Sequence, residues 1–330
     1  MKNTIKIIAM MFVIFGFITL PSCNNNPEKE KTQEPVEAAA DHEEHEHEHI
    51  FACPMHPEVK GREGENCSKC GMPLEHMDEE SAAGNYQMQY SSSPQKIEAG
   101  KEVSLSFTPR NKDNNTQAVP LDVEHEKKIH LILVNEDLSW FDHIHPEYQA
   151  DGSYKVNEKF PNGGNYILYA DYKPAGGSHQ LEKINVVVEG KKAEAINYTK
   201  SRNTAKSGDF AVTLKPDDGK FISNKAIHFD GAFILNGKAF DVNDLQNYLG
   251  AKGHMVGINL KTKEYMHLHP EVEGNILHFH TTFEAAGMYR VWLQFMHEEK
   301  LHTVDFILEV AQGVATERDN HAHGEHAHQH

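Results

Sequence analysis

Two segments of this sequence carry the same arrangement of histidines, each followed by a proline. The phrase "FDHIHPEYQ" contains His143 and His145, and "YMHLHPEVE" contains His267 and His269. In a β-strand, residues i and i+2 point to the same face, so each pair projects two imidazoles together. Neutral imidazole is the commonest metal ligand in proteins and suits copper and zinc. The spacing therefore indicates a metal site in each segment.

A third histidine joins each pair through the geometry of a hairpin. The stretch "IHLILVNEDLSWFDHIH" predicts two strands that turn near Asp137. Pairing about that centre places His130 across from His145, with Cβ atoms ~5 Å apart. In the second segment His254 lies opposite His269 in the same way. We therefore expect three imidazoles to converge on one ion in each hairpin.

The match between the two segments extends over about 100 residues, which indicates an internal repeat. On the last expected strand of each unit, His179 and His302 are candidates for a fourth ligand. The extra pair His278 and His280 is expected to be exposed. A single strand histidine is usually a surface or hydrogen-bonded residue, and folding alone could also keep this register. The equivalent residues are His130, His143 and His145 with His254, His267 and His269, and Phe160, Tyr166 and His179 with Phe283, Tyr289 and His302.

A compact segment rich in cysteine and histidine precedes the two units. Within "IFACPMHPEVKGREGENCSKCGMPLEHM", Cys53 and His56 form a C-x2-H pair, and Cys67 and Cys70 form a C-x2-C pair. Two such pairs at this separation can close a tetrahedral metal site. Thiolates together with methionine thioethers are soft ligands, which favour copper(I) and likewise silver.

This segment resembles the heavy-metal-binding domain of copper-transporting P-type ATPases and of periplasmic heavy-metal efflux adaptors. Ser68 stands where that family usually has proline. The resemblance implies binding of copper, silver or similar ions, but says nothing about transport. A structural zinc site is the alternative, and a redox pair of cysteines is not favoured because the thioredoxin-like βαβ setting is missing. The residues that match the motif are Cys53, Met55, His56, Cys67, Cys70 and Met72.

The chain begins with features of an export signal. Lys2 and Lys6 precede an apolar run that is short for a membrane span. The phrase "LPSC" resembles the bacterial lipobox, so we expect Cys23 to be lipidated and the protein to be tethered to a membrane outside the cytoplasm. An uncleaved anchor is the alternative. In either case the remaining chain works in the cell envelope.

Composition also favours metal ions as the partner. The formal charge is −17 and 24 of the 330 residues are histidine, which argues against nucleic acid and for cations. The histidine-acid stretches "HEEHEHEH" and "HAHGEHAHQH" either hold divalent ions loosely or form a solvated polyelectrolyte.

The strand-like runs predict a mainly β protein with two tandem antiparallel β-sandwiches, immunoglobulin-like or cupredoxin-like. A small metal-binding domain and a disordered lipoprotein tether precede them. The expected order is a signal peptide (1–22), a tether (23–49), a heavy-metal-binding domain (50–77), a linker (78–95), a first sandwich (96–190), a linker (191–208), a second sandwich (209–312) and a tail (313–330).

We therefore expect a membrane-tethered protein that captures or buffers copper-like ions and passes them to an efflux transporter or a metallochaperone. Zinc is the alternative ion. A copper-dependent oxidoreductase and an adhesive or scaffolding lipoprotein are the alternative functions. The sequence lacks a convincing catalytic constellation, so we expect no enzyme. Residues 86–330 contain no cysteine, which excludes a blue-copper centre there because that centre needs a cysteine ligand.

Overall fold

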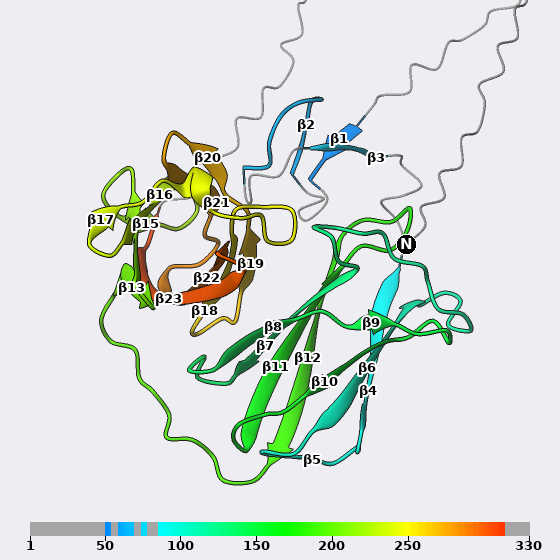
Figure 1. Ribbon diagram of the computed structural model, residues 1–330. Coiled ribbons are helices and arrows are strands. Elements are labelled where there is room, and N and C mark those ends of the chain that lie inside the picture. The colour runs from blue at the N-terminus through cyan, green and yellow to red at the C-terminus, as the bar shows by residue number, and fades with distance from the viewer. Residues whose placement is uncertain (1–49, 54–58, 69–73, 78–84, 314–330) are drawn as a thin grey trace, which may run out of the picture. The chain divides into compact units, whose positions relative to one another are not determined.

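Most of the part of the chain that the structure describes consists of β-strands joined by turns and loops (Figure 1). The computed structural model describes residues 50–53, 59–68, 74–77 and 85–313, which belong to one compact unit. The expected lipidation site Cys23, both histidine-rich ends and four residues of the cysteine segment lie outside the described residues. Those four are Met55, His56, Cys70 and Met72.

The first sandwich consists of a four-stranded sheet in the order β4-β6-β10-β9 and a five-stranded sheet in the order β5-β12-β11-β7-β8. All strand pairs are antiparallel except β5 with β12, which is parallel. The strands are β4 (Tyr86–Ser93), β5 (Ile97–Glu98), β6 (Val103–Asn111), β7 (Ile129–Asn135), β8 (Phe141–Ile144), β9 (Glu147–Tyr148), β10 (Tyr154–Glu158), β11 (Gly164–Tyr172) and β12 (Gln180–Glu189).

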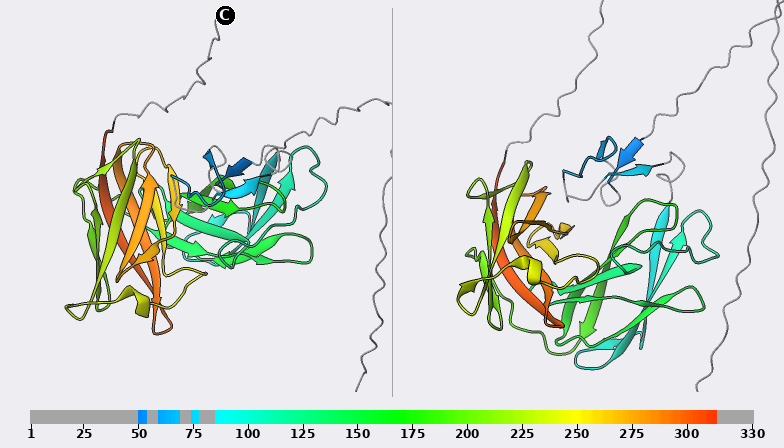
Figure 2. Two further views of the ribbon diagram at one scale, coloured as in Figure 1. Left: turned by 90° about the horizontal axis from the view of Figure 1, so that it is seen from above. Right: turned by 45° about the horizontal axis from the view of Figure 1, so that its top comes forward.

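The second sandwich has the same plan. One sheet runs β13-β14-β16-β21-β20, with β17 paired to β16, and the other runs β15-β23-β22-β18-β19. Here β15 pairs with β23 in parallel, and the long strands β22 and β23 lie side by side (Figure 2). The elements are β13 (Thr204–Ser207), β14 (Phe210–Pro216), β15 (Phe221–Ile222), β16 (Ala226–Leu235), β17 (Lys238–Ala239), the 3₁₀ helix η2 (Val242–Asp244), β18 (His254–Asn259), β19 (Tyr265–Leu268), β20 (Glu271–Glu273), β21 (Ile276–Thr282), β22 (Gly287–His297) and β23 (Lys300–Ala311).

A third, small sheet is formed by the cysteine segment, in the order β2-β1-β3. Its strands are β1 (Ile50–Ala52), β2 (Lys60–Gly61) and β3 (Glu75–Met77). Cys53 directly follows β1 and Cys67 lies in the loop between β2 and β3, and both are fully buried. Such short strands cannot build a core of their own, so ligand bonds are a natural source of stability for this segment.

The cores of the two sandwiches share a matching aromatic pair. Phe160 packs against Tyr166 with ring centroids 4.7 Å apart, and Phe283 packs against Tyr289 at 4.9 Å. Each tyrosine hydroxyl donates a 2.8 Å hydrogen bond to a backbone carbonyl four residues earlier in the chain. A buried tyrosine needs such a partner for its hydroxyl, and both sandwiches supply it in the same place. The two domains therefore share local structure as well as strand order.

Strands β7 and β18, which carry the first histidine of each hairpin, are buried on both faces. In β7, Leu131 and Leu133 face the core of the first sandwich, whereas Ile132 and Val134 join a third apolar cluster that also contains Val256, Ile258 and Trp292 of the second sandwich. His130 shares the parity of Ile132, and His254 shares that of Val256. Because alternate residues of a strand point to opposite faces, both histidines lie on the faces that pack between the sandwiches.

The boundaries of the sandwiches differ from those expected. Residues 78–95 were expected to be a linker, but β4 pairs with β6 along eight residues and so belongs to the first sandwich. The expected linker 191–208 likewise contributes β13, which pairs with β14. Both β4 and β13 lie at the edge of a sheet and contain many polar residues. The apolar pattern by which a strand is recognised in a sequence is therefore weak in them.

Among the residues that the structure describes, no helix has both the length and the apolar character needed to cross a lipid bilayer.

Candidate metal centre

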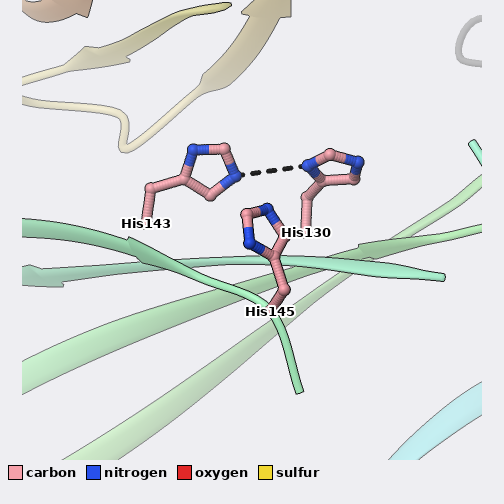
Figure 3. Close-up of side chains that lie close together, drawn as sticks. All are labelled: His130, His143 and His145. Atoms are coloured by element: carbon pink, nitrogen blue, oxygen red, sulfur yellow. Dashed lines mark hydrogen bonds between the residues drawn. The ribbon is translucent and has the colours of Figure 1, made fainter. Parts of the chain in front are cut away.

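The first three-histidine group, which we call the first triad, consists of His130, His143 and His145. Strand β7 pairs with β8 so that Ile132 lies opposite His143, and the same register brings His130 opposite His145. One nitrogen from each ring lies within 4.8 Å of the others. Figure 3 shows His130 and His143 facing each other, with His145 beside the gap between them. The hairpin thus brings its three imidazoles together, as the spacing of the histidines in the sequence predicts.

The second triad consists of His254, His267 and His269, and it has the same construction. Strand β18 pairs with β19 with Val256 opposite His267, which brings His254 opposite His269. Again one nitrogen from each ring lies within 4.8 Å of the others. His254 and His267 are at most 2% exposed, so the ligand atoms are withdrawn from water.

The first histidine of each triad is held by a backbone carbonyl. His130 Nε2 lies 3.1 Å from the carbonyl oxygen of Glu124, and His254 Nε2 lies 2.7 Å from that of Tyr248. A carbonyl can only accept, so Nε2 carries the proton in both rings. In the neutral imidazole the inward nitrogen, Nδ1, is then an unprotonated lone pair.

The second histidine of each triad is held by a side chain from the other sandwich. His143 Nδ1 lies 2.7 Å from Gln294 Oε1, and Gln294 Nε2 donates to Thr303 Oγ1. His267 Nδ1 lies 3.4 Å from Asp171 Oδ2. Both oxygens accept from Nδ1, so in the neutral form of each ring Nε2 is the inward lone pair.

These assignments bring unprotonated nitrogens face to face. His130 Nδ1 lies 3.2 Å from His143 Nε2, and His254 Nδ1 lies 3.4 Å from His267 Nε2. With both outer nitrogens protonated, neither inward nitrogen of a pair can donate to the other. In the second triad, Nε2 of His269 lies 2.9 Å from Nδ1 of His254, so a proton on His269 Nε2 can be donated to it. The buried Nε2 of His145 and Nδ1 of His269 have no hydrogen-bond partner. The first triad is therefore a concentrated set of acceptors that a cation would satisfy, and in the second a cation would take the place of the proton between His269 and His254.

Burial lowers the pKa of five of the six triad imidazoles. It lowers the pKa of His130 to about 3 and that of His145 to about 4. It lowers the pKa of His254 and of His269 as well, and neighbouring histidines add to the effect. Neutral imidazole is the form that binds metal, so at neutral pH the ligands need not lose a proton first.

His125 is a further histidine at this centre that the sequence analysis did not single out. It lies in a two-residue turn closed by hydrogen bonds between Glu124 and Lys127, with φ of 46°. Its ring stacks on that of His269, with centroids 3.7 Å apart. The equivalent turn of the second sandwich contains Leu249, also at positive φ. Neither a repeat nor a motif marks His125; its only sequence signal is its nearness to His130.

His179 does not enter the first triad as a fourth ligand. It precedes β12, and β11 lies between β12 and β7 in the sheet, so the last strand is not beside the triad. Instead His179 pairs with the buried carboxylate of Asp171 on β11. Burial alone would lower the pKa of His179, but Asp171 raises it. Burial alone would raise the pKa of Asp171, but His179 and His267 hold it well below its usual value.

His302 is also separate from its triad, for the same reason. Strand β22 lies between β23 and β18, and the His302 ring stacks on Phe295 with centroids 5.1 Å apart. Its Nδ1 contacts Ser207 Oγ at 3.2 Å. Sequence register identified the equivalence of His179 and His302 but could not reveal the strand order that removes both from the triads.

The extra pair on β21 is partly buried rather than freely exposed. His278 Nδ1 donates to Asp230 Oδ1 at 3.0 Å, and its Nε2 lies 3.3 Å from Nδ1 of the exposed His228. His280 Nε2 donates to the carbonyl of Cys67 at 2.9 Å. These histidines thus contact one another and the cysteine segment, and they lie on a different sheet from the second triad.

Comparisons with known proteins bear on both parts of the chain. No curated protein matches it. The family described as Heavy metal binding domain matches residues 50–77, the segment whose motif the sequence analysis identified. This match supports a metal-binding domain there, while the identity of the ion stays open.

Solved structures that resemble the chain do so weakly. Salmonella alpha-2-macroglobulin reacted with methylamine has 12% identity and a TM-score of 0.25, covering 69% of this chain and 15% of that chain. The Escherichia coli adhesin FdeC has 13% identity and a TM-score of 0.24, covering 70% and 65%. The fibronectin(III)-like modules of Clostridium thermocellum CbhA have 15% identity and a TM-score of 0.19, covering 73% and 100%. The chain spans less than two thirds of the first two proteins.

A second family accounts for both sandwiches and therefore for most of the chain, with one match for each. It covers β4 as well as the strands that carry the triads, and it assigns no chemistry to either. The chain belongs to this family, described as Domain of unknown function (DUF8832), which matches residues 80–190 and 205–312.

Proposed function

We propose that this protein captures and buffers copper-like metal ions in the cell envelope. The observation that carries the proposal is the pair of buried triads, in each of which three imidazoles bring one ring nitrogen each within 4.8 Å of the others. Polar groups in a protein interior normally have hydrogen-bond partners. A metal ion would supply the missing partner in the first triad and would take the place of the shared proton in the second.

The donor set favours borderline or soft ions. Three imidazoles suit copper and zinc, whereas magnesium and calcium prefer oxygen ligands. The cysteine segment adds thiolates, which bind copper(I), silver or zinc. We assign copper(I) or silver to the cysteines and a borderline ion to the triads, with zinc as the alternative at both.

Binding rather than catalysis is the better fit to the space beside the triads. The cavity lined by His125, His130, Asp171, His179 and His267 has a volume of about 10 Å³. That volume holds about one water molecule. A substrate larger than water has no room there unless the loop that carries His125 moves.

The cellular setting is part of the proposal and rests on the sequence. The lipobox-like phrase before Cys23 supports a lipid tether in the envelope, and the formal charge of −17 favours cations over nucleic acid. In this setting the protein would hold ions outside the cytoplasm and pass them to an efflux transporter or a metallochaperone.

The test is the metal content of the protein beginning at Cys23, loaded with copper(II) and desalted in free histidine to strip loose sites. Replacing His143, His145, His267 and His269 together by alanine is expected to remove at least one equivalent, because each triad then keeps one imidazole. Copper retained per chain, measured by plasma mass spectrometry, reports the loss.

A matched control replaces His228 and His278 by alanine. These residues also bring two imidazole nitrogens within 3.3 Å, but they lie outside the triads. The control is expected to retain as much copper as the unaltered protein. Equal copper content in the four-histidine variant and the unaltered protein would show that the triads are not the binding sites.

A further inference from the structure

Each sandwich positions a metal ligand of the other. Asp171 lies opposite His130 in the first sandwich, and Gln294 lies opposite His254 in the second. The two residues are therefore equivalent in position. Asp171 nevertheless accepts from His267 of the second triad, and Gln294 accepts from His143 of the first. His143 and His267 are therefore each oriented by a side chain of the opposite sandwich.

The two triads also adjoin each other. The rings of His130 and His267 have centroids 5.3 Å apart, and those of His143 and His267 are 6.0 Å apart. His130 stacks toward His254 at 6.2 Å. Since a ligand nitrogen lies about 2 Å from its ion, ions in the two triads would lie within about 12 Å of each other.

His125 bridges the two groups from the side. Its ring stacks on His269 of the second triad and meets His130 of the first edge-on, with centroids 6.2 Å apart. It also meets His254 edge-on at 6.0 Å. The seven rings form one continuous cluster rather than two isolated sites.

The two triads differ in the charge of the residue that orients them. Asp171 offers a carboxylate: one oxygen pairs with His179, and the other faces His267 Nδ1 at 3.4 Å and the hydroxyl of Tyr265 at 3.3 Å. Gln294 offers a neutral amide to His143. A carboxylate behind a ligating histidine increases its basicity and typically changes metal affinity 10- to 100-fold.

From this arrangement we propose that the two triads form a single two-ion centre, in which the second triad, backed by Asp171, binds a divalent ion first. The inference rests on the proposed function, because it requires both triads to bind metal. It adds that the ions are close neighbours and that the sandwiches depend on each other for ligand orientation. Asp171 and Gln294 are positioning residues and do not themselves contact the ion.

The test is a copper(II) titration of the full chain from Cys23, in a weak competing chelator, followed by electron paramagnetic resonance. The first equivalent is expected to give the signal of an isolated ion, and it should match the signal of a His143→Ala variant, which keeps the second triad. The second equivalent is expected to give dipolar broadening and a half-field transition, since the two spins lie close together.

His130→Ala and His254→Ala, each altering one triad, are expected to abolish the half-field transition. Two bound ions without magnetic coupling, or one ion shared by both triads, would overturn the two-ion centre but leave metal capture intact. Failure of the proposed function is distinct: the His130→Ala/His254→Ala double variant would then bind as much copper as the unaltered protein.

Size-matched exchanges test the orienting residues. Asp171→Asn is expected to weaken the first-binding ion 10- to 100-fold, because the carboxylate behind His267 is lost. Gln294→Glu is expected to strengthen the second-binding ion by a similar factor. In the Asp171→Asn/Gln294→Glu double variant the order of filling should reverse, so that the first signal matches a His267→Ala variant. If the two changes merely loosened the fold, both triads would bind copper more weakly and the order of filling would not reverse. An unchanged order of filling would refute the assignment of Asp171 and Gln294 as the residues that set it.

Discussion

Lowering the pH from 7 to 4.5 is expected to reduce the free energy of unfolding of the metal-free protein by at least about 3 kcal/mol. The reason is the set of buried histidines, whose pKa values burial depresses. The pKa of His130 falls to about 3, and those of His125 and His145 fall to about 4. In the unfolded chain each would titrate near 6.5.

The direction of the effect follows from proton binding. Between about pH 6.5 and pH 4 the unfolded chain binds protons that the folded chain excludes, so stability falls as the pH falls. One pKa unit corresponds to about 1.4 kcal/mol, so the two units between pH 6.5 and 4.5 make His130 alone worth about 3 kcal/mol. His179 has a raised pKa, so its stabilising contribution still grows between pH 7 and about 6.5 and is complete below that, which offsets only a small part of the loss.

The measurement is urea denaturation at pH 7, 5.5 and 4.5 with a chelator present, followed by tryptophan fluorescence. Trp292 belongs to the apolar cluster shared by the two sandwiches and so reports on the packing around the triads. His130→Gln, which cannot be protonated, is expected to flatten the pH dependence. His228→Ala/His278→Ala is expected to preserve it. A urea midpoint independent of pH in the unaltered protein would contradict the prediction.

The convergence of each triad could be predicted from sequence because local rules determine it. Two residues in alternation share a face of a strand, and a hairpin centred near Asp137 fixes which residue lies across from which. His130 and His145 lie only 15 residues apart, so a single turn decides their pairing. The β-sandwich class followed in the same way from short strands separated by turn residues.

What surrounds the triads could not be predicted, because it depends on strand order and on packing between the sandwiches. Asp171 and Gln294 lie on strands adjacent to their own triads but orient the opposite ones. In the sequence, the only sign that Asp171 and Gln294 are equivalent is that they are 123 residues apart, the offset of the repeat. Because one is an aspartate and the other a glutamine, the sequence gives no reason to compare them. The sequence also does not reveal that another strand separates the last strand of each sandwich from its triad. For this reason His179 and His302 were expected as fourth ligands.

Replacing Cys53 and Cys67 by serine is expected to weaken copper(I) binding by the full chain at least about 1000-fold, or about 4 kcal/mol. Thiolates are the soft ligands that favour copper(I), and a hydroxyl cannot replace them. Both cysteines are fully buried, and both lie in the segment matched by the Heavy metal binding domain family. The affinity is measured under anaerobic conditions by competition with a coloured copper(I) chelator.

The control is Ser68→Ala, a change beside Cys67 that removes no soft ligand. It is expected to leave the copper(I) affinity unchanged. Copper(II) binding by the triads should also survive the cysteine changes, since the triads need no thiolate. If copper(I) affinity persisted without the two cysteines, these would not be the copper(I) ligands, and the remaining soft donors of the segment, such as Cys70, or the imidazoles would have to bind the ion. If only zinc affinity fell, the cysteine segment would be a structural zinc site. The expected result is that the cysteine changes remove only copper(I) binding and the triad changes remove only copper(II) binding. The protein would then bind soft ions and borderline ions at two sites of different chemistry.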